Sequence, residues 1–217
     1  MAPIIQNNEI NLSELENSNE LNIVFSNKQL LYKNKICISD DRDVSIIILD
    51  YAKQETEFDL VVELGKNSSF SMRVACAQVS DKAKNYNIEV IHKGDNATSF
   101  ISTNGYNASN SKLYFRPVAT ILNGVKKSTT RVEGRIINSN DEAKSTILPV
   151  LNIADNDVIQ ANHGAALGSI DQNELFYLMT RGLSKKEAES LLIASYFKPV
   201  LNKFSSSNQE EFEKILF

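Results

Sequence analysis

The hydrophobic positions between Leu21 and about Ile159 fall into short runs that polar turns separate. The clearest runs are rich in β-branched residues and too short for helices: VSIIILDYA (44–52), FDLVVELG (58–65), SFSMRVACAQV (69–79), YNIEVIHK (86–93) and PVATILNG (117–124). The turns between them resemble one another. Each has glycine, asparagine or aspartate at the bend and then a small or hydroxyl residue, as in LGKNSSFS (64–71) and HKGDNATSF (92–100). We therefore expect a region of many short β-strands.

Two architectures fit such a region. Recurring turns of one kind are typical of a β-solenoid, in which each turn covers the core of its neighbour. The spacing between the runs is irregular, however, and a β-sandwich also has short strands joined by turns. The pattern of strands and turns leaves both architectures open.

The periodicity changes to that of helices after Asp171. Asp171 with Glu174 and Ser184 with Glu187 have the spacing of capping boxes, which mark helix N-termini. Gly182 lies between them, where the first helix is expected to end in a left-handed conformation. Residues 171–217 therefore predict a small helical part.

Apolar residues at helical spacing define the expected faces of these helices. They are Leu175, Phe176, Leu178 and Met179 in the first helix, and Ala188, Leu191, Leu192, Ser195 and Tyr196 in the second. Asn208 with Glu211 is expected to begin a third helix, which carries Phe212, Ile215 and Leu216. These apolar faces are larger than a helical part of this size needs for its own core. We therefore expect some of them to pack on the β region and some to meet a partner.

Charge and composition narrow the partners and the compartment. The formal net charge of −4 argues against nucleic acid or an anionic membrane as the main partner. No apolar run is long enough to span a membrane, and the start of the sequence does not resemble a secretion signal. We expect a cytoplasmic protein whose two cysteines, Cys37 and Cys76, are reduced.

Catalytic motifs are weak in this sequence. GVKKST at Gly124 lacks the order of a phosphate-binding loop, because valine rather than lysine follows the glycine. The two histidines, His92 and His163, are too few for a histidine-rich metal site. His92 is interpreted as a partly exposed residue at a strand end. His163, flanked by glycine and alanine, leaves three interpretations open: a metal ligand, a catalytic base, or a polar residue in a turn.

The stretch DNDVIQANHGAALGSIDQNELFYLMTRGLSKKEAESLLIASYFKPVL, residues 155–201, carries several motifs in a fixed order. An acidic turn is followed by Asn-His-Gly-Ala around His163 and by Gly-x-Ile-Asp, which ends at Asp171. Leu-Phe-Tyr-Leu-x-Thr-Arg-Gly-Leu and Glu-Ala-x-x-Leu-Leu come next. This series resembles the C-terminal signature of the SufB/SufD family of iron–sulfur cluster assembly proteins. Residues 131–158 are similar to the last turns of the family's solenoid.

The resemblance implies a fold and a set of partners. The fold is a right-handed parallel β-helix with a C-terminal helical subdomain. We accordingly predict a flexible lead-in over residues 1–20, a β-helix core over 21–165 and a helical subdomain over 166–217. In the family, SufB and SufD pair through their β-helices, and their C-terminal helices each hold a copy of the SufC ATPase, an ABC-type subunit. The cluster is assembled on that complex.

Two positions distinguish this chain within the family pattern. Ala161 stands where many members carry a cysteine, and Gly164 stands where SufB-type chains carry a glutamate and SufD-type chains a glycine. The chain is therefore most similar to a short SufD that lacks the long N-terminal helical region of most members. We expect a non-catalytic subunit that binds no cofactor stably.

The resemblance also implies a role for His163. Thiolates are the usual cluster ligands and histidine is a less common one. Without a nearby thiol, His163 could supply only a nitrogen ligand to a transient iron–sulfur cluster at a subunit interface, and the partner would supply the cysteine. Asn162, Gly164 and Ala165 are expected to form a slim turn beside it, at the junction with the helices.

The helical subdomain is expected to dock the SufC-like ATPase. Grooves that hold helices are usually contacted through a few apolar or aromatic residues at helical spacing, with exposed charges at the rim. The candidates are Tyr177, Met179, Leu183, Lys185, Lys186 and Tyr196.

Other functions remain open at the level of sequence. The partner could be a SufB-like chain or a second copy of this chain, and a homodimeric β-solenoid scaffold would then have no cluster role. A self-contained β-solenoid transferase with His163 as general base is the third alternative. Against it, no second catalytic group lies near His163 in the sequence, and such an enzyme would not require the helices.

Overall fold

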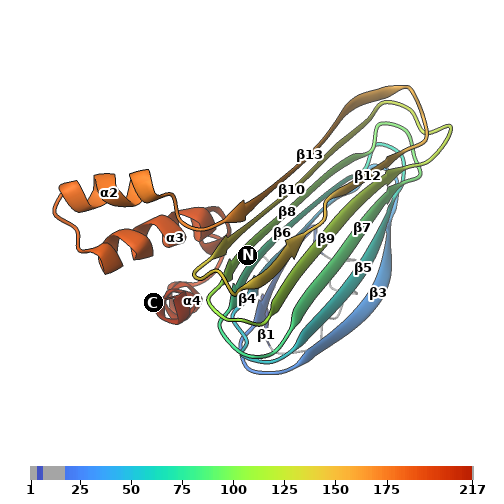
Figure 1. Ribbon diagram of the computed structural model, residues 1–217. Coiled ribbons are helices and arrows are strands. Elements are labelled where there is room, and N and C mark those ends of the chain that lie inside the picture. The colour runs from blue at the N-terminus through green and yellow to red at the C-terminus, as the bar shows by residue number, and fades with distance from the viewer. Residues whose placement is uncertain (1–3, 7–17, 217) are drawn as a thin grey trace.

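The computed structural model describes residues 4–6 and 18–216, and it shows a parallel β-helix of about five turns followed by three helices (Figure 1). Most of the predicted lead-in, residues 1–3 and 7–17, lies outside the described residues. From β2 to β11 successive strands alternate between two sheets, and every pairing is parallel. The solenoid is thus the correct one of the two architectures.

The two sheets contain every strand of the described residues. In sheet order, the seven-stranded sheet consists of β1 (Ile4–Gln6), β2 (Glu20–Phe25), β4 (Asp43–Asp50), β6 (Ser69–Gln78), β8 (Thr98–Asn107), β10 (Ser128–Asn138) and β13 (Val158–Gly168). The six-stranded sheet consists of β11 (Lys144–Ile147), β9 (Lys112–Ile121), β7 (Lys84–His92), β5 (Thr56–Leu64) and β3 (Leu30–Ile38), with β12 (Val150–Ile153) also paired to β9.

The length of a turn changes along the β-helix. Ser45 and Ser71, whose hydroxyl groups hydrogen-bond across neighbouring strands, are 26 residues apart. Asp95 and Lys126, which are bonded in a later turn, are 31 residues apart. The strands stay in register because the extra residues lie in the connections between them. This drift explains why the spacing of the hydrophobic runs is irregular in a regular solenoid.

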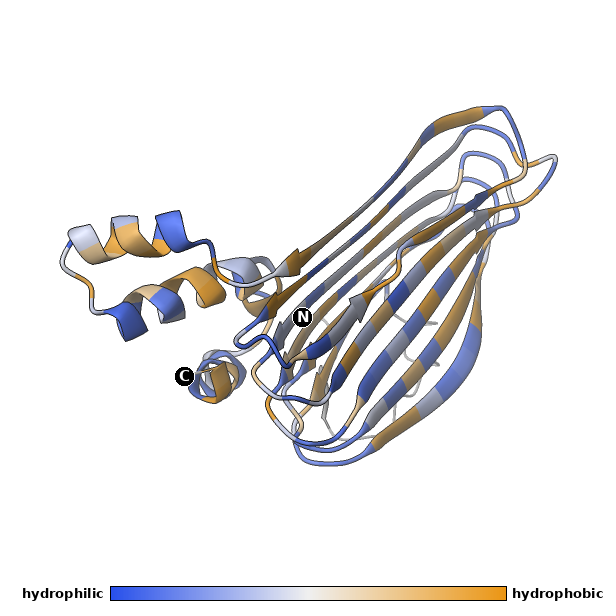
Figure 2. Cartoon of the chain, viewed as in Figure 1, coloured by the Kyte–Doolittle hydropathy of each residue, from blue (hydrophilic) through white to orange (hydrophobic). Residues whose placement is uncertain are grey.

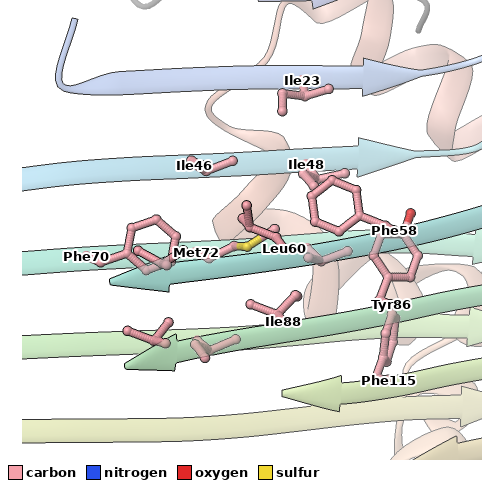
Figure 3. Packing of buried hydrophobic residues seen from close by; sticks show 14 of the residues in the cluster. Ile23, Ile46, Ile48, Phe58, Leu60, Phe70, Met72, Tyr86, Ile88 and Phe115 are labelled. Carbon is pink, nitrogen blue, oxygen red and sulfur yellow. The ribbon is translucent and has the colours of Figure 1, made fainter. Parts of the chain in front are cut away.

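Alternation of apolar and polar residues places the core between the two sheets. In β5, for example, every second residue from Thr56 to Leu64 is buried, and Figure 2 shows the same alternation along the neighbouring strands. Aromatic rings at equivalent positions form a stack inside the β-helix: Tyr32, Phe58, Tyr86 and Phe115, with ring centres 5.0, 5.6 and 5.4 Å apart. Figure 3 shows the last three of these rings. Each fully buried Phe contributes roughly 1.5–3 kcal/mol, so this stack stabilises several consecutive turns.

A ladder of left-handed residues forms the turns at one end of the strands. Four residues have φ angles between 54° and 58°: Asp41, Asn67, Asn96 and Lys127. The first three lie two residues before a strand of the seven-stranded sheet, and Lys127 lies one residue before β10. Asparagine and aspartate tolerate this conformation better than most residues. Their side chains also bond across turns, as Asn96 does to Asn67 at 3.0 Å. The Asn-rich turns of the sequence are therefore a structural feature of the solenoid.

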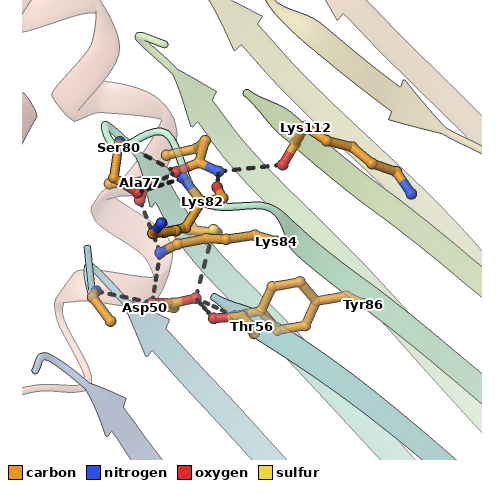
Figure 4. Close-up of polar contacts among 11 residues, drawn as sticks. Asp50, Thr56, Ala77, Ser80, Lys82, Lys84, Tyr86 and Lys112 are labelled. Atoms are coloured by element: carbon orange, nitrogen blue, oxygen red, sulfur yellow. Dashed lines mark hydrogen bonds and ion pairs between the residues drawn. The ribbon is translucent and has the colours of Figure 1, made fainter. Parts of the chain in front are cut away.

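A buried ion pair joins the two sheets at the other end of the strands (Figure 4). The Nζ of Lys84 lies 2.8 Å from Oδ1 of Asp50, and both side chains are fully buried. The hydroxyl groups of Tyr86 and Thr56 donate to Oδ2 of Asp50 at 2.5 and 3.2 Å, and Lys84 also donates to the carbonyl of Ala77. Burial, and after it the charge of Asp50, raises the pKa of Tyr86. Buried charges are tolerated only with partners of this kind.

The helices begin close to the expected residues. The carboxylate of Asp171 accepts hydrogen bonds from the amides of Asn173 and Glu174 and caps α2 (Gln172–Thr180). Gly182 has a φ of 97°, as expected after a helix end. Ser184 and Glu187 form a capping box at the start of α3 (Lys185–Leu201). The third helix, α4 (Ser206–Leu216), begins before the expected Asn208, because Ser205 rather than Asn208 accepts the capping hydrogen bond.

A second apolar cluster forms where α3 and α4 cover the outer face of the seven-stranded sheet. The sheet contributes residues such as Ile47, Leu49 and Ile137, and the helices contribute Phe197 and Phe212. The expected inner face of α3 was only partly correct. Its buried residues are Ala188, Ile193, Phe197, Val200 and Leu201, whereas Leu191 is 52% exposed. Within the part of the chain that the structure describes, no helix is long and apolar enough to cross a membrane.

Candidate functional site

Strand β13 is the last strand of the seven-stranded sheet. It pairs with β10 from Val158 to Gly168, and no strand among residues 4–6 and 18–216 pairs with its other edge (Figure 1). The row of backbone donors and acceptors along that edge is therefore available to another chain. The strand has no charged side chain.

The register of β13 fixes the direction of His163. His163 is paired with Val132, which is buried in the core between the sheets. Paired residues of parallel strands project to the same face of the sheet, so His163 projects toward the interior side. It is nevertheless exposed, because β13 forms the last turn and no further turn covers it. The imidazole is thus at the open end of the β-helix.

The expected turn around His163 is wrong. Asn162, Gly164 and Ala165 lie within strand β13, in register with Arg131, Glu133 and Gly134. Asparagine, glycine and alanine disfavour strands in isolation, but the hydrogen bonds to β10 hold this segment extended. The connection to the helices comes later, between Gly168 and Gln172.

His92 has a structural environment. It is fully buried rather than partly exposed, because its strand end is covered inside the β-helix. Its Nε2 lies 2.8 Å from Oγ of Ser99, which in turn lies 2.7 Å from Oγ1 of Thr130. Burial lowers the pKa of His92 to about 4, so the imidazole is neutral at physiological pH.

The described residues offer few metal ligands. No group of three or more His, Cys, Asp or Glu side chains within residues 18–216 could hold a metal ion. Cys76 is fully buried, and burial raises the pKa of its thiol far above the ordinary value. Cys37 is exposed, but it lies on β3 at the opposite end of the β-helix from β13. His163 could therefore contribute one nitrogen to a site completed by another chain.

The last turn also exposes large apolar side chains. Ile159 and Leu167 of β13 are 69% and 51% exposed, and Leu148 and Ile153 near β12 are 47% and 46% exposed. Sequence reasoning did not select these residues as functional. The available signal was the lack of charge throughout residues 158–168, which is unusual for an exposed edge strand.

Helices α2 and α3 form a hairpin, and α2 projects beyond the β-helix (Figure 1). Of the candidates for ATPase docking, Tyr177 and Met179 are exposed on α2. Lys185 and Lys186 are exposed at the start of α3, and Leu183 between the helices is partly buried. A hollow of about 370 Å³ between the helices is lined by Asn173, Glu174, Tyr177, Leu178 and Leu192.

Tyr196 lies apart from this hairpin surface. Its ring is partly buried and is covered by the guanidinium group of Arg135, whose Cζ lies 4.8 Å from the ring centre. Two residues that the expected docking set omitted, Phe176 and Leu191, are 68% and 52% exposed. Their helical spacing predicted inward faces, but the α2–α3 hairpin projects from the β-helix, so both residues stay uncovered (Figure 1).

Comparison with known proteins gives a consistent set of relatives. The chain is 31% identical over 122 residues to the iron–sulfur cluster assembly protein SufD of Bacillus subtilis, an alignment that covers 56% of this chain and 28% of that protein. It is 25% identical over 158 residues to SufBD family proteins of Staphylococcus epidermidis and Staphylococcus aureus, covering 72% of this chain and 33% of each relative. The matched parts thus span a third or less of the relatives' own length.

A family model described as "SUF system FeS cluster assembly, SufBD core domain" matches residues 5–196, which include nearly the whole β-helix and most of the α2–α3 hairpin. The parallel β-helix and the helices that follow it agree with the fold expected from the C-terminal signature. The chain belongs to the SufB/SufD family of iron–sulfur cluster assembly proteins.

Proposed function

We propose that the chain is a SufD-like, non-catalytic scaffold subunit of a SufBCD-type complex. In this complex it pairs with a SufB-like chain through the β-helix and docks a SufC-like ATPase through the C-terminal helices. The observation that carries the proposal is the open last turn, in which an uncharged edge strand and exposed apolar side chains lie side by side.

The edge of β13 has little of the protection that exposed strands carry in isolated proteins; a register shift at Ile159 near its start is the irregularity that its pairing with β10 shows. Natural edge strands usually carry lysines, prolines or bulges, or are covered by another element. β13 is eleven residues long and contains neither a charge nor a proline. Covering Ile159 and Leu167 with the β-helix of a partner would remove their apolar surface from water and satisfy the free backbone groups.

His163 gains a role in such a pair. Its side chain lies at the open end of the β-helix, so a chain that covers β13 would enclose it in the interface. There the imidazole can supply one nitrogen to a cluster under assembly, which is the cargo of the complex. The partner supplies the cysteine that this chain lacks at Ala161.

The α2–α3 hairpin supplies the second interface. Phe176, Tyr177 and Met179 are exposed on one short helix, which packs mainly against α3. Aromatic and Met side chains of this kind are typical of surfaces that become buried by a partner. Lys185 and Lys186 at the rim would influence how fast the ATPase associates.

The test is co-expression with SufB-like and SufC-like proteins from the same organism, followed by affinity purification and native mass spectrometry. Ile159→Lys should remove the SufB-like chain and retain the ATPase, because a lysine would be buried in an apolar interface. The matched control is Leu31→Lys, since Leu31 is 71% exposed on the edge strand β3 at the opposite end. It should retain both partners.

The hairpin is tested in the same experiment. A double substitution, Phe176→Ala with Tyr177→Ala, should weaken ATPase binding by about thirtyfold and leave the SufB-like chain bound. A homodimer that forms in place of the mixed pair, and that Ile159→Lys disrupts, would favour the homodimeric scaffold. Retention of the SufB-like chain by Ile159→Lys would refute pairing through β13.

A further inference from the structure

A hollow of about 420 Å³ lies on the outer face of the seven-stranded sheet, beside α3. Strands β8, β10 and β13 line it, together with Tyr196 of α3. A second hollow of about 370 Å³ also includes Arg135, Ala166 and Tyr196, and extends to Asp171 and Glu174 at the start of α2. We call the two hollows together the outer groove. It is distinct from the free edge of β13 and from the exposed tip of the hairpin.

Arg135 is the central charge of the outer groove. Its guanidinium group is stacked on the ring of Tyr196 at 4.8 Å, and its side chain is exposed. Within residues 18–216, Arg135 has no ion-pair partner. Stacking uses the face of the guanidinium and leaves its N–H groups free to bind a carboxylate in bidentate geometry. The ring thereby holds the group in place before any ligand binds.

Two further arginines adjoin the Glu133 end of the groove without lining it: Arg73 is in register with Ser102, and Arg131 is paired with Glu133. Arg73 and Arg131 approach the ring of Phe100 from their own strands, with Cζ 4.9 and 5.9 Å from its centre. Glu133, which lines the groove, is already paired with Arg131 at 2.7 Å. This end therefore has a net positive charge, although the whole chain has a net charge of −4.

The opposite end of the groove is acidic. Asp171 and Glu174 lie there, and the carboxylate of Asp171 accepts hydrogen bonds from the amides of Asn173 and Glu174. The groove is thus negatively charged near Asp171 and Glu174 and positively charged near Arg135. A ligand that fits both ends must carry acidic groups at one end and a basic group at the other.

We propose that the outer groove binds an extended peptide segment of a partner protein, with acidic residues against Arg135 and a basic residue against Asp171 and Glu174. Ser102 and Asn104 line the groove and can bond to the backbone of such a segment. Gly164 and Ala166 keep its floor low enough for a backbone to approach. Nucleic acid fits poorly, because a continuous phosphate backbone would be repelled at the acidic end.

The test measures binding of a fluorescein-labelled peptide to the whole chain by fluorescence anisotropy. The probe has glutamates at one end, lysines at the other and serine and glycine between them. A peptide of the same composition with alternating charges is the comparison. The segregated peptide should bind saturably and more tightly than the alternating one, and added salt should weaken its binding.

Three variants locate the site. Arg135→Gln should weaken binding by about tenfold, which is the loss of one charge-assisted interaction. Gly164→Leu should weaken it without changing any charge, and the fold should tolerate it because a Cβ at Gly164 would meet no atom within 4 Å. Arg116→Gln, on the outer face of β9 in the other sheet, is the matched control and should bind normally.

Circular dichroism of each variant shows that it is folded before binding is compared. Equal binding of the two peptides, equal loss in Arg116→Gln, or tighter binding of a single-stranded oligonucleotide would each overturn the proposal. Because the assay uses the chain alone, its result does not depend on pairing with SufB-like or SufC-like proteins.

Discussion

Burial of His92 makes the stability of the β-helix depend on pH in a defined range. The imidazole is enclosed between the sheets, and burial lowers its pKa from 6.5 to about 4. In the unfolded chain the pKa returns to about 6.5. Between pH 6.5 and 4 the unfolded chain therefore binds a proton that the folded chain does not. Stability falls as the pH falls through this range, and the loss from His92 is complete below about pH 4.

The magnitude follows from the two pKa values. At pH 5 the unfolded chain is almost fully protonated at His92 and the folded chain is mostly neutral. The difference lowers the free energy of unfolding by about 2 kcal/mol relative to pH 7. A chain of this size is expected to have a total stability of about 5–15 kcal/mol, so the loss is measurable.

The assay is urea-induced unfolding at pH 7 and pH 5, with the wild type compared with His92→Gln. Glutamine does not titrate, and its amide can still bond to the hydroxyl of Ser99. Whatever the stability of the variant at pH 7, its loss of stability between pH 7 and pH 5 should be smaller than that of the wild type by about 2 kcal/mol. Equal losses in the two proteins would show that His92 is not buried as the structure has it.

Further predictions concern the turns, the buried ion pair and the core. Lys127→Asn should stabilise the chain by about 0.5–1 kcal/mol in the same assay, because Lys127 has a φ of 55°, which asparagine tolerates better. Asn96 occupies the equivalent position one turn earlier. An unchanged or lower stability would contradict this prediction. Lys84→Met should cost about 3–5 kcal/mol by leaving the carboxylate of Asp50 buried without its counter-charge. Adding Asp50→Asn to Lys84→Met should recover part of that stability. If the losses of the two single variants simply add in the double variant, Lys84 and Asp50 are not coupled and the prediction is refuted. Gly134→Ala should lower the melting temperature, because its Cβ would lie 2.7 Å from a methyl group of Ile147.

The strands were predictable because their side chains alternate and their turns repeat. The solenoid was not decided by this pattern, since the repeat drifts from 26 to 31 residues as the connections lengthen. Family resemblance decided it. The aromatic stack could not be seen in the sequence, because Tyr32 and Phe58 become neighbours only after the register of the strands is known.

The helix caps around the candidate site were predicted correctly from the sequence. The prediction failed where pairing with a distant strand overrides the conformational preference of the local residues. Residues 162–165 have the composition of a turn, yet β10 holds them as a strand. His92 was interpreted as partly exposed because its strand ends at a polar turn, and the sequence gives no sign that the opposite sheet covers it. The inner face of α3 was misjudged because Leu191 belongs to the projecting hairpin, while Phe197 lies over the sheet.

Cluster formation tests the scaffold role most directly. The chain would be co-purified with its SufB-like and SufC-like partners and supplied with iron and a sulfur donor, and the cluster bound per complex would be measured by its visible absorption. The complete complex should accumulate a cluster, and His163→Ala should lower the yield while complex mass and melting temperature stay unchanged. A full cluster yield from the intact His163→Ala complex would contradict the ligand role, and a full yield without this chain would contradict the scaffold role.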